Sequence, residues 1–253
     1  MKIALIVPAR LHSTRLPEKP LADIAGKSLI IRVVEQGLKC RNITGVWVAT
    51  DHESIFEHVR QAGYQAVMTS KDHVSGTDRI AEAASSIDAD VFINIQGDEP
   101  LIHPRQIEDL AAVFQNQDIQ IATQMNVIRQ PEEVFDYNKV KVVTDIYHKA
   151  LYFSRQAIPA FRDLPYKDWF AQAVYYKHVG IYAFRKEALL KITQLSTGFL
   201  EKAESLEQLR WLENGYHVHC FLTEYESVGV DTQEDLDKVN AIVRMMENQG
   251  FNP

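Results

Sequence analysis

The sequence predicts an α/β fold with a mostly parallel sheet. Over the first hundred residues, short apolar runs alternate with longer segments whose apolar residues recur at helical spacing. Strands that alternate with helices in this way form βαβ units, in which the strands run parallel. Several of these segments end at a glycine or an acid, among them Asp51, Gly63 and Gly97, as expected where an element gives way to a turn.

The first half of the chain predicts four strands and three helices. The strands are short apolar runs at residues 3–7, 46–50, 66–69 and 91–96. The helices lie between them, at residues 28–40, 53–62 and 78–86.

The second half is less regular. β-rich runs predict strands at residues 140–143, 150–153, 179–184 and 217–222. Leucines 206, 209 and 212 predict a helix closed by Gly215, and residues 234–247 predict a terminal helix. Residues 162–176 are aromatic without periodicity, which indicates a mobile or partner-contacting insertion. Because no linker-like tract divides the chain, we expect one domain over residues 1–253, with an insertion at roughly 154–178.

Composition narrows the class of protein. The chain has 253 residues, 46% of them hydrophobic and 24% charged, which is ordinary for a globular protein with a sizeable core. A net charge of −7 argues against nucleic-acid binding. No signal pattern and no stretch near the ~18 apolar residues of a membrane span is present, so we expect a cytoplasmic protein that does not contact membranes. Cys40 and Cys220 are expected to be reduced packing residues.

A basic loop follows the first expected strand. Arg10, Arg15 and Lys19 fall within ten residues, in a stretch that also holds two hydroxyl side chains and several prolines. Cations neutralise phosphate oxygens, hydroxyls and free amides bind them, and prolines stiffen the chain. The pattern is typical of a phosphate-binding loop, with a basic surface turn as the alternative.

Acidic residues follow other expected strands. In an open α/β sheet, ligands bind beyond the carboxyl ends of the parallel strands, where the basic loop, Asp51 and Asp98 all fall. Mg²⁺ prefers one or two carboxylates together with phosphate oxygens and waters, which favours Asp98 and Asp231 as ligands. The alternatives are a turn-capping Asp98, and Asp231 or Thr232 as the N-cap of the last helix.

Several common motifs fail. Gly26-Lys27-Ser28 resembles the end of a P-loop, but Leu21 stands where that motif needs glycine. No GxGxxG motif and no spacing for a Ser-His-Asp triad occurs. His217 and His219 share one face of an expected strand, and without a further ligand cluster a solvated face is favoured over a metal site.

Two helix starts carry polar residues of interest. Ser75 and Gly76 begin a helix whose amides, together with Arg79, can bind an anion or a base carbonyl, with an ordinary N-cap and an exposed arginine as the alternative. Glu207 and Arg210 lie on an amphipathic helix, where a weak surface ion pair is the alternative to a binding role.

Together these segments resemble the 3-deoxy-manno-octulosonate (Kdo) cytidylyltransferases, the CMP-Kdo synthetases of bacterial lipopolysaccharide synthesis. The matching segments run in order over nearly the whole chain, at residues 8–10, 15–17, 19–21, 48–51, 68–69, 75–79, 96–102, 140–143, 151–155, 178–183, 206–210 and 229–232. Many sugar nucleotidyltransferases share the first-loop pattern, whereas the combination with residues 152–155 and 206–210 is much more specific. One departure is Glu18, where the family usually has Gly, beside Lys19. At this position Glu18 lacks the conformational freedom that glycine gives the backbone.

The resemblance implies a nucleotidyltransferase-like (Rossmann-like) mixed, mostly parallel sheet sandwiched by helices, with the insertion as the dimerisation lobe of a homodimer. It implies an enzyme that joins CTP and Kdo to give CMP-Kdo and pyrophosphate, with Mg²⁺ as cofactor. Two alternatives stay open: the same chemistry on another acidic sugar, such as sialate or an 8-amino analogue of Kdo, and a non-catalytic nucleotide-sugar sensor. A sensor is expected to have lost Arg10, Lys19 or Asp98, and all three are present.

Residue roles follow from the same resemblance and from the chemistry above. The expected catalytic residues are Arg10, Lys19 and Asp98, and the expected metal ligands are Asp98 and Asp231. The expected nucleotide-binding residues are Pro8, Ala9, Arg10, Arg15, Lys19, Ser75, Gly76, Arg79 and Gln96. The expected sugar-binding residues are Arg155, His178, Tyr182, Glu207 and Gln208. Among the last group, Arg155 suits the Kdo carboxylate, because a guanidinium binds a carboxylate in a fork.

Overall fold

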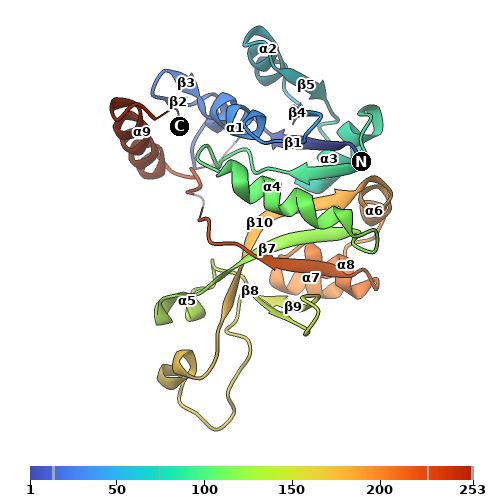
Figure 1. The fold of residues 1–253 in the computed structure, drawn as a ribbon, viewed down its shortest axis with the longest axis vertical. Helices are drawn as coiled ribbons and strands as arrows, with labels where there is room; N and C mark the ends of the chain where they lie inside the picture. The colour runs from blue at the N-terminus through green and yellow to red at the C-terminus, as the bar shows by residue number, and fades with distance from the viewer. Residues whose placement is uncertain (13–14, 74, 227, 252–253) are drawn as a thin grey trace. The chain divides into compact units, whose positions relative to one another are not determined.

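The computed structural model describes residues 1–12, 15–73, 75–226 and 228–251. The chain forms two compact units (Figure 1). The first unit comprises Met1–Ala112 and Glu226–Pro253, and the second comprises Val113–Tyr225. The single domain expected over residues 1–253 stays a prediction.

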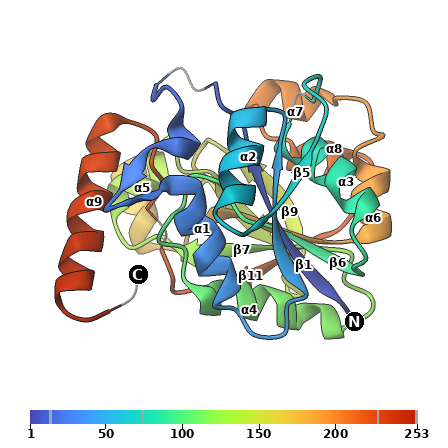
Figure 2. The same ribbon diagram turned by 90° about the horizontal axis from the view of Figure 1, so that it is seen from above.

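Four parallel strands form the sheet of the first unit. They are hydrogen-bonded in the order β6 (Val91–Asn94), β1 (Ile3–Ala9), β4 (Gly45–Thr50) and β5 (Gln65–Met68). In the central β1, Leu5, Ile6 and Val7 have no exposed surface, because the strand has a neighbour on each edge and helices packed along it (Figure 2). All four strands were predicted, with small differences at their ends.

Helices connect these strands in the predicted order. They are α1 (Leu29–Leu38), α2 (Glu53–Gln61) and α3 (Gly76–Ser86). Two helices come later in the chain: α4 (Pro104–Ala112), which was not predicted, and α9 (Gln233–Asn248), the predicted terminal helix. The short elements η1 (Lys19–Leu21), β2 (Asp23–Ile24) and β3 (Lys27–Ser28) precede α1. The buried Arg32 of α1 donates to the carbonyls of Ile24 and Ala25 and pairs with Glu247 of α9 at 3.0 Å. It thereby ties the segment before α1 and the terminal helix α9 to one side chain.

The second unit contains a mixed sheet. Its strands are β7 (Ile121–Val127), β8 (Lys141–Thr144), β9 (Ala150–Ser154), β10 (Tyr176–Arg185) and β11 (Val218–Leu222). β7 pairs parallel with β11 and antiparallel with β10, and β8 pairs antiparallel with both β10 and β9. The helical elements are η2 (Val113–Gln115), α5 (Pro131–Phe135), α6 (Lys186–Ile192), α7 (Phe199–Glu204) and α8 (Gln208–Glu213). The α/β fold class is confirmed, while β7 and four of these helical elements (η2, α5, α6 and α7) were not predicted.

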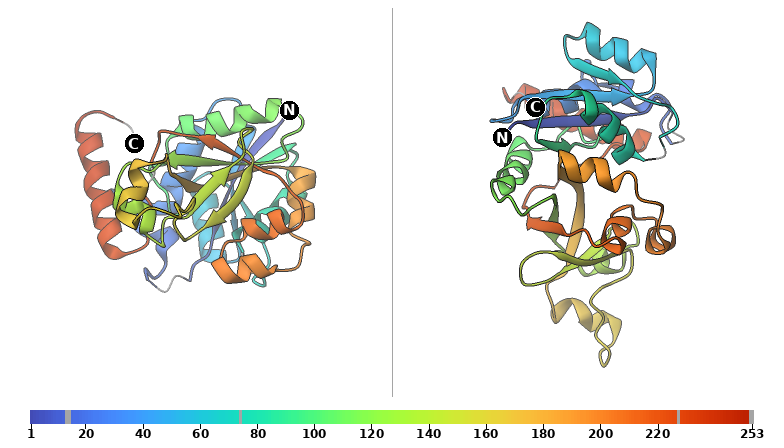
Figure 3. Two further views of the ribbon diagram at one scale, coloured as in Figure 1. Left: turned by 90° about the horizontal axis from the view of Figure 1, so that it is seen from below. Right: turned by 90° about the vertical axis from the view of Figure 1, so that its right-hand side faces the viewer.

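The aromatic segment between β9 and β10 has structure that its pattern did not predict. It extends beyond the β8–β9 hairpin and carries η3 (Tyr166–Ala171) (Figure 3). Trp169 and Tyr175 are buried in a small cluster with Ile128 and Val134. The aromatic residues therefore build a local core, which explains why their spacing follows neither a strand nor a helix.

No helix in the described part of the chain has both the length and the apolar character needed to cross a membrane.

A partly buried acid in the second unit makes stability depend on pH. Glu133 of α5 pairs with Lys139 and, at 3.0 Å, with Lys177. Burial alone would raise the pKa of this carboxyl, but the two ammonium groups outweigh it and lower the pKa from 4.5 to about 2. The folded state therefore favours the charged form, and the resulting stability is present above the unfolded pKa and lost as the pH falls toward the folded one.

We expect Glu133→Gln to lower the free energy of unfolding at neutral pH by about 1–3 kcal/mol. The difference from the wild type should shrink as the pH falls from 4.5 toward 2, the interval between the two pKa values. Urea unfolding at a series of pH values measures it. Glu132→Gln, at the exposed neighbouring position, is the matched control. An equal loss at all pH values would show that the carboxylate charge is irrelevant.

Candidate functional site

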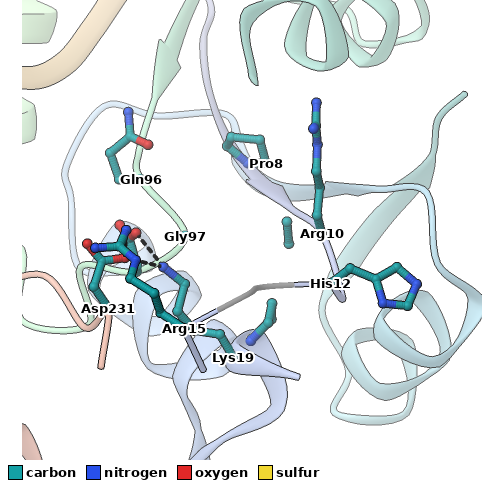
Figure 4. Close-up of a pocket in the computed structure, with 11 residues that line it drawn as sticks. Pro8, Arg10, His12, Arg15, Lys19, Gln96, Gly97 and Asp231 are labelled. Atoms are coloured by element: carbon teal, nitrogen blue, oxygen red, sulfur yellow. Dashed lines mark hydrogen bonds and ion pairs between the residues drawn. The ribbon is translucent and has the colours of Figure 1, made fainter. Parts of the chain in front are cut away.

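A polar pocket of about 360 Å³ lies in the first unit, at the carboxyl ends of β1 and β6 (Figure 4). Its lining comes from the loop after β1, the segment after β6 and the residues before α9. The lining residues are Pro8, Ala9, Arg10, His12, Arg15, Lys19, Pro20, Gln96, Gly97, Asp98 and Asp231. The predicted edge of the sheet is therefore where the pocket forms.

Gly97 permits the close approach of two loops at this edge. A Cβ atom at Gly97 would lie 2.7 Å from the backbone carbonyl oxygen of Pro8, closer than side-chain carbons pack. In addition, the backbone N–H of Val230 donates to the carbonyl of Asp98 at 2.9 Å. Segments from three distant parts of the sequence are thus held together by backbone contacts.

The two predicted metal-binding acids meet at one cation. The Lys19 ammonium lies 2.7 Å from Asp98 Oδ2 and 3.0 Å from Asp231 Oδ1, and Arg15 lies 3.1 Å from the same Asp231 oxygen (Figure 4). Burial alone would lower the pKa of Lys19, but its ion pairs with Asp98 and Asp231 outweigh this and raise the pKa. Lys19 is therefore charged at neutral pH and balances the two acids.

Neither acid uses its carboxylate to cap a helix or a turn. Thr232, not Asp231, caps α9, since its side chain accepts from the N–H of Asp235 in a capping box. Within the described residues, the Asp98 side chain accepts only from Lys19 and caps no turn.

The donor set suits a hard divalent cation. One oxygen of each carboxylate binds Lys19, and the other oxygen of each has no partner among the described residues. No third His, Cys, Asp or Glu joins the two acids in the described part of the chain to complete a protein-only metal cage. Two carboxylates with room for phosphate oxygens and waters is the arrangement that Mg²⁺ prefers.

The loop after β1 has two further features. Arg10 is exposed and donates to the carbonyl of His73 at 2.6 Å. Glu18 has φ 51° and ψ 29°, the left-handed conformation that glycine adopts without cost. The conformational cost predicted for a non-glycine residue at this position is therefore present. It amounts to roughly 1–2 kcal/mol. The two hydroxyl side chains of this loop, Ser13 and Thr14, lie outside the described residues.

The start of α3 lies outside the pocket lining as far as the chain is described. The Ser75 hydroxyl caps the helix by accepting from the N–H of Asp78 at 3.1 Å. Arg79 is fully buried, not exposed as the alternative had it, and its guanidinium donates to Thr69 and, at 2.8 Å, to Asp51. It joins the segments that follow β4 and β5. Nucleotide contacts of Ser75, Gly76 and Arg79 stay predictions.

Arg155 follows β9 in the second unit. Its Nε donates to the carbonyl of Glu204 at 2.8 Å, and its two terminal nitrogens donate to the carbonyls of Tyr137 and Ser205 at 3.1 and 3.4 Å. These contacts use three of the five N–H groups of a guanidinium. The side chain is held in place by backbone, and its remaining donors stay available for a carboxylate.

His178 and Tyr182 lie side by side on β10, with ring centroids 5.1 Å apart. Burial lowers the pKa of His178 to about 3, so the ring is neutral at physiological pH. Tyr182 is 8% exposed, and its hydroxyl has no hydrogen-bond partner among the described residues. An unpaired buried hydroxyl is costly, so Tyr182 is a candidate ligand-binding group.

The predicted helix at residues 206–210 is α8. Glu207 is its N-cap residue, and Gln208, its first residue, is buried. Arg210 is buried in a two-pronged pair with Glu201, with both N–O distances 2.6 Å. Arg210 thus has a structural partner on α7. The weak pair with Glu207 considered from the sequence stays a prediction.

A second hollow, of about 370 Å³, lies in the second unit, and its lining includes Asp118, Tyr216, His217 and His219. No group of three metal-ligating side chains occurs there or elsewhere among the described residues. In the first pocket, His12 is one of three lining residues, with Pro20 and Gly97, to which the sequence assigned no binding role. Its ring meets His52 edge-on at 6.1 Å, and only its position between Arg10 and Arg15 offered a signal.

Comparison with known proteins identifies the family. A cytidylyltransferase family model matches residues 4–226. The 3-deoxy-manno-octulosonate cytidylyltransferase of Parabacteroides distasonis is 47% identical over 96% of this chain and 98% of its own length. The chain belongs to the 3-deoxy-manno-octulosonate cytidylyltransferase family. The protein of the same name from Geobacter sulfurreducens is 46% identical over 94% of this chain and 98% of its own.

Solved structures agree with this membership. CMP:2-keto-3-deoxy-manno-octonic acid synthetase in complex with CTP superposes with a TM-score of 0.90, at 41% identity over 97% of this chain and 99% of that one. A glucose-1-phosphate thymidylyltransferase from Bacillus anthracis shares the fold, with a TM-score of 0.65 at 17% identity over 96% of this chain and 95% of that one. As a member of the 3-deoxy-manno-octulosonate cytidylyltransferase family, the chain is a nucleotidyltransferase.

We expect Gly97→Ala to lower stability by about 1–3 kcal/mol, because the new methyl group must push the Pro8 backbone away. It should also lower kcat/KM for CTP by about tenfold or more, since displacement of a positioned group by an ångström is costly. Thermal melting and steady-state kinetics measure the two effects. Gly229→Ala is the matched control, because nothing lies within 4 Å of a Cβ atom there. Equal behaviour of both variants would contradict the close-approach argument.

Proposed function

We propose that this chain transfers the cytidylyl group of CTP to Kdo, giving CMP-Kdo and pyrophosphate for lipopolysaccharide synthesis. The observation that carries the proposal is the pocket in which three cations and two acids converge, in a chain of this family. The similarity to a synthetase solved with CTP supports the choice of nucleotide. The anomeric 2-hydroxyl of Kdo attacks the α-phosphate in line, its proton leaves to solvent or to a phosphate oxygen, and pyrophosphate departs.

Positioning and charge stabilisation dominate such a reaction, because the protein forms no covalent bond. Arg10, Arg15 and Lys19 bind the triphosphate. Arg10 and Lys19 stabilise the negative charge that builds on the leaving pyrophosphate. Backbone groups near Pro8 and Ala9, Gln96 and the start of α3 contact the rest of the nucleotide, and Arg79 supports them or reads the cytosine.

Asp98 and Asp231 are the residues that would hold Mg²⁺. When bound, the ion polarises the α-phosphate and lowers the pKa of the attacking hydroxyl. The two carboxylates are already gathered by Lys19, at 2.7 and 3.0 Å, so that little rearrangement of the acids is needed. Lys19 is freed from part of this pairing when it contacts phosphate.

On the sugar side, Arg155 binds the Kdo carboxylate through the N–H groups that the backbone carbonyls do not use. His178, Tyr182, Glu207 and Gln208 contact the remainder of the sugar. These polar groups suit a polyhydroxylated acid, because they combine a cation, neutral donors and acceptors.

We also propose a cytoplasmic homodimer with the segment between β9 and β10 as a contact. Support comes from its exposed apolar side chains, since Tyr166 is 70% and Val174 is 58% exposed. Exposed apolar groups next to a packed cluster are typical of association surfaces.

A pyrophosphate-release screen tests the activity directly. The four nucleoside triphosphates are each combined with Kdo, its 8-amino analogue and sialic acid. We expect turnover with CTP and Kdo to exceed every other combination by about 100-fold, because a site built to bind specific polar groups rejects analogues that leave them unpaired. Higher turnover with another sugar would move the proposal to that substrate. Absence of turnover with every pair would favour the sensor alternative.

We expect Asp98→Asn to reduce kcat/KM by more than ~100-fold, because loss of a metal carboxylate removes several kcal/mol of transition-state stabilisation. It should also weaken Mg²⁺ binding to the CTP-loaded protein, measured by titration calorimetry. Asp109→Asn, an exposed change on α4, is the control. Near-normal turnover of Asp98→Asn, or of the wild type in EDTA, would contradict the metal assignment.

A further inference from the structure

A bulge interrupts the pairing of β10 with β7. Tyr182 is opposite Thr123 and Val179 is opposite Gln124, so that two extra residues of β10 stand between positions that are adjacent on β7. The bulge turns two backbone carbonyls toward one side chain. The Thr123 hydroxyl lies 3.1 Å from the carbonyl oxygen of Val179 and 2.7 Å from that of Ile181.

The same hydroxyl has a third partner, Nε2 of His178, at 3.0 Å. Thr123 is fully buried, so water does not compete for these contacts. A hydroxyl has one proton to donate and two lone pairs that accept. Three partners around one hydroxyl therefore constrain where every proton lies.

The number of available protons determines the tautomer of His178. Carbonyl oxygens only accept, so the hydroxyl proton goes to the nearer one, on Ile181. The Nε2 contact then requires a proton on the imidazole nitrogen. With Nε2 unprotonated, either two lone pairs would face each other at 3.0 Å, or both carbonyls would face a hydroxyl without a proton for them.

We propose that Thr123 is a positioning residue that holds the His178 proton on Nε2, so that Nδ1 is presented as an acceptor to a hydroxyl group of the sugar substrate. The inference deepens the proposed function and rests on it. Thr123 belongs to none of the segments from which the sequence predicted sugar binding. It acts through His178.

The surroundings of His178 agree with a neutral acceptor. Its ring packs edge-on against Phe153, with the ring centroids 5.2 Å apart, and lies beside Tyr182, so that the residue is mostly buried with a minor part exposed. Because burial holds the pKa near 3, the ring carries a single proton at neutral pH, and Nδ1 has a free lone pair.

The neighbouring Tyr182 adds a donor. The residue is 8% exposed, and its buried hydroxyl has no hydrogen-bond partner among the described residues. An acceptor nitrogen beside an unpaired hydroxyl matches an alcohol, which both donates and accepts. A carboxylate would satisfy Tyr182 and repel Nδ1. The pair therefore selects the polyhydroxyl part of the sugar and leaves its carboxylate to a cation.

The test compares Thr123→Val, which keeps the shape and removes the hydroxyl, with Thr123→Ser, which keeps the hydroxyl. For Thr123→Val we expect KM for Kdo to rise about tenfold or more, because the polar contact of His178 with the sugar is then no longer fixed or paired. KM for CTP should change less than about twofold, and Thr123→Ser should stay within about threefold of the wild type in both, because it restores the hydrogen bonds.

A second readout is independent of activity. Nitrogen-15 NMR of the histidine side chains reports which ring nitrogen carries the proton. We expect the Nε2–H form for His178 in the wild type and in Thr123→Ser, and a share of the Nδ1–H form in Thr123→Val. Assignment uses the signal that His178→Gln removes.

Three results would overturn the proposal. An Nδ1–H tautomer in the wild type overturns it, even if Thr123→Val does not fold. Equal impairment of Thr123→Ser and Thr123→Val, or an equal rise of both KM values with a lower melting temperature, shows a purely structural role and also overturns it. If the wild type makes no CMP-Kdo, the proposed function fails, whereas the tautomer is still read from the spectrum.

Discussion

The close contact between the backbone at Gly97 and the end of β1 is the constraint on which the candidate nucleotide site depends. A side chain at position 97 would clash with the backbone of Pro8 and push the segment after β6 away from it. With that segment in place, the carbonyl of Asp98 receives the N–H of Val230, and the chain before α9 is drawn to the same edge. The two acids are adjacent because two backbones touch, and not because the acids attract each other.

Two like charges brought together in this way need compensation. Lys19 supplies most of it, because its side chain is 16% exposed and bonded to both acids, while Arg15 adds an exposed contact to one of them. Buried groups of opposite charge stabilise each other only when they are paired with good geometry. The arrangement keeps the pocket charged and polar without a ligand, ready for an anion that brings its own cation.

Much of the first unit was predictable from sequence, because its strands are apolar runs and its helices have apolar faces. The edge of the sheet that carries the site followed from the parallel topology. The meeting of Asp98 with Asp231, 133 positions apart, did not, since it depends on a backbone hydrogen bond between loops. β7 was missed for a different reason. Thr123, Gln124 and Asn126 are buried polar residues, so their strand lacks both an apolar run and a regular alternation.

Adjacent residues before α9 divide two tasks between them. The hydrogen bonds that begin the helix come from the side chains of Thr232 and Asp235, and the Asp231 carboxylate takes no part in them. Selection for a more stable terminal helix can therefore change its first turn while the acid stays constant. The reverse also holds, because altering position 231 leaves the helix cap intact. A lineage of such enzymes is free to tune its thermal tolerance at this point of the chain without touching its chemistry.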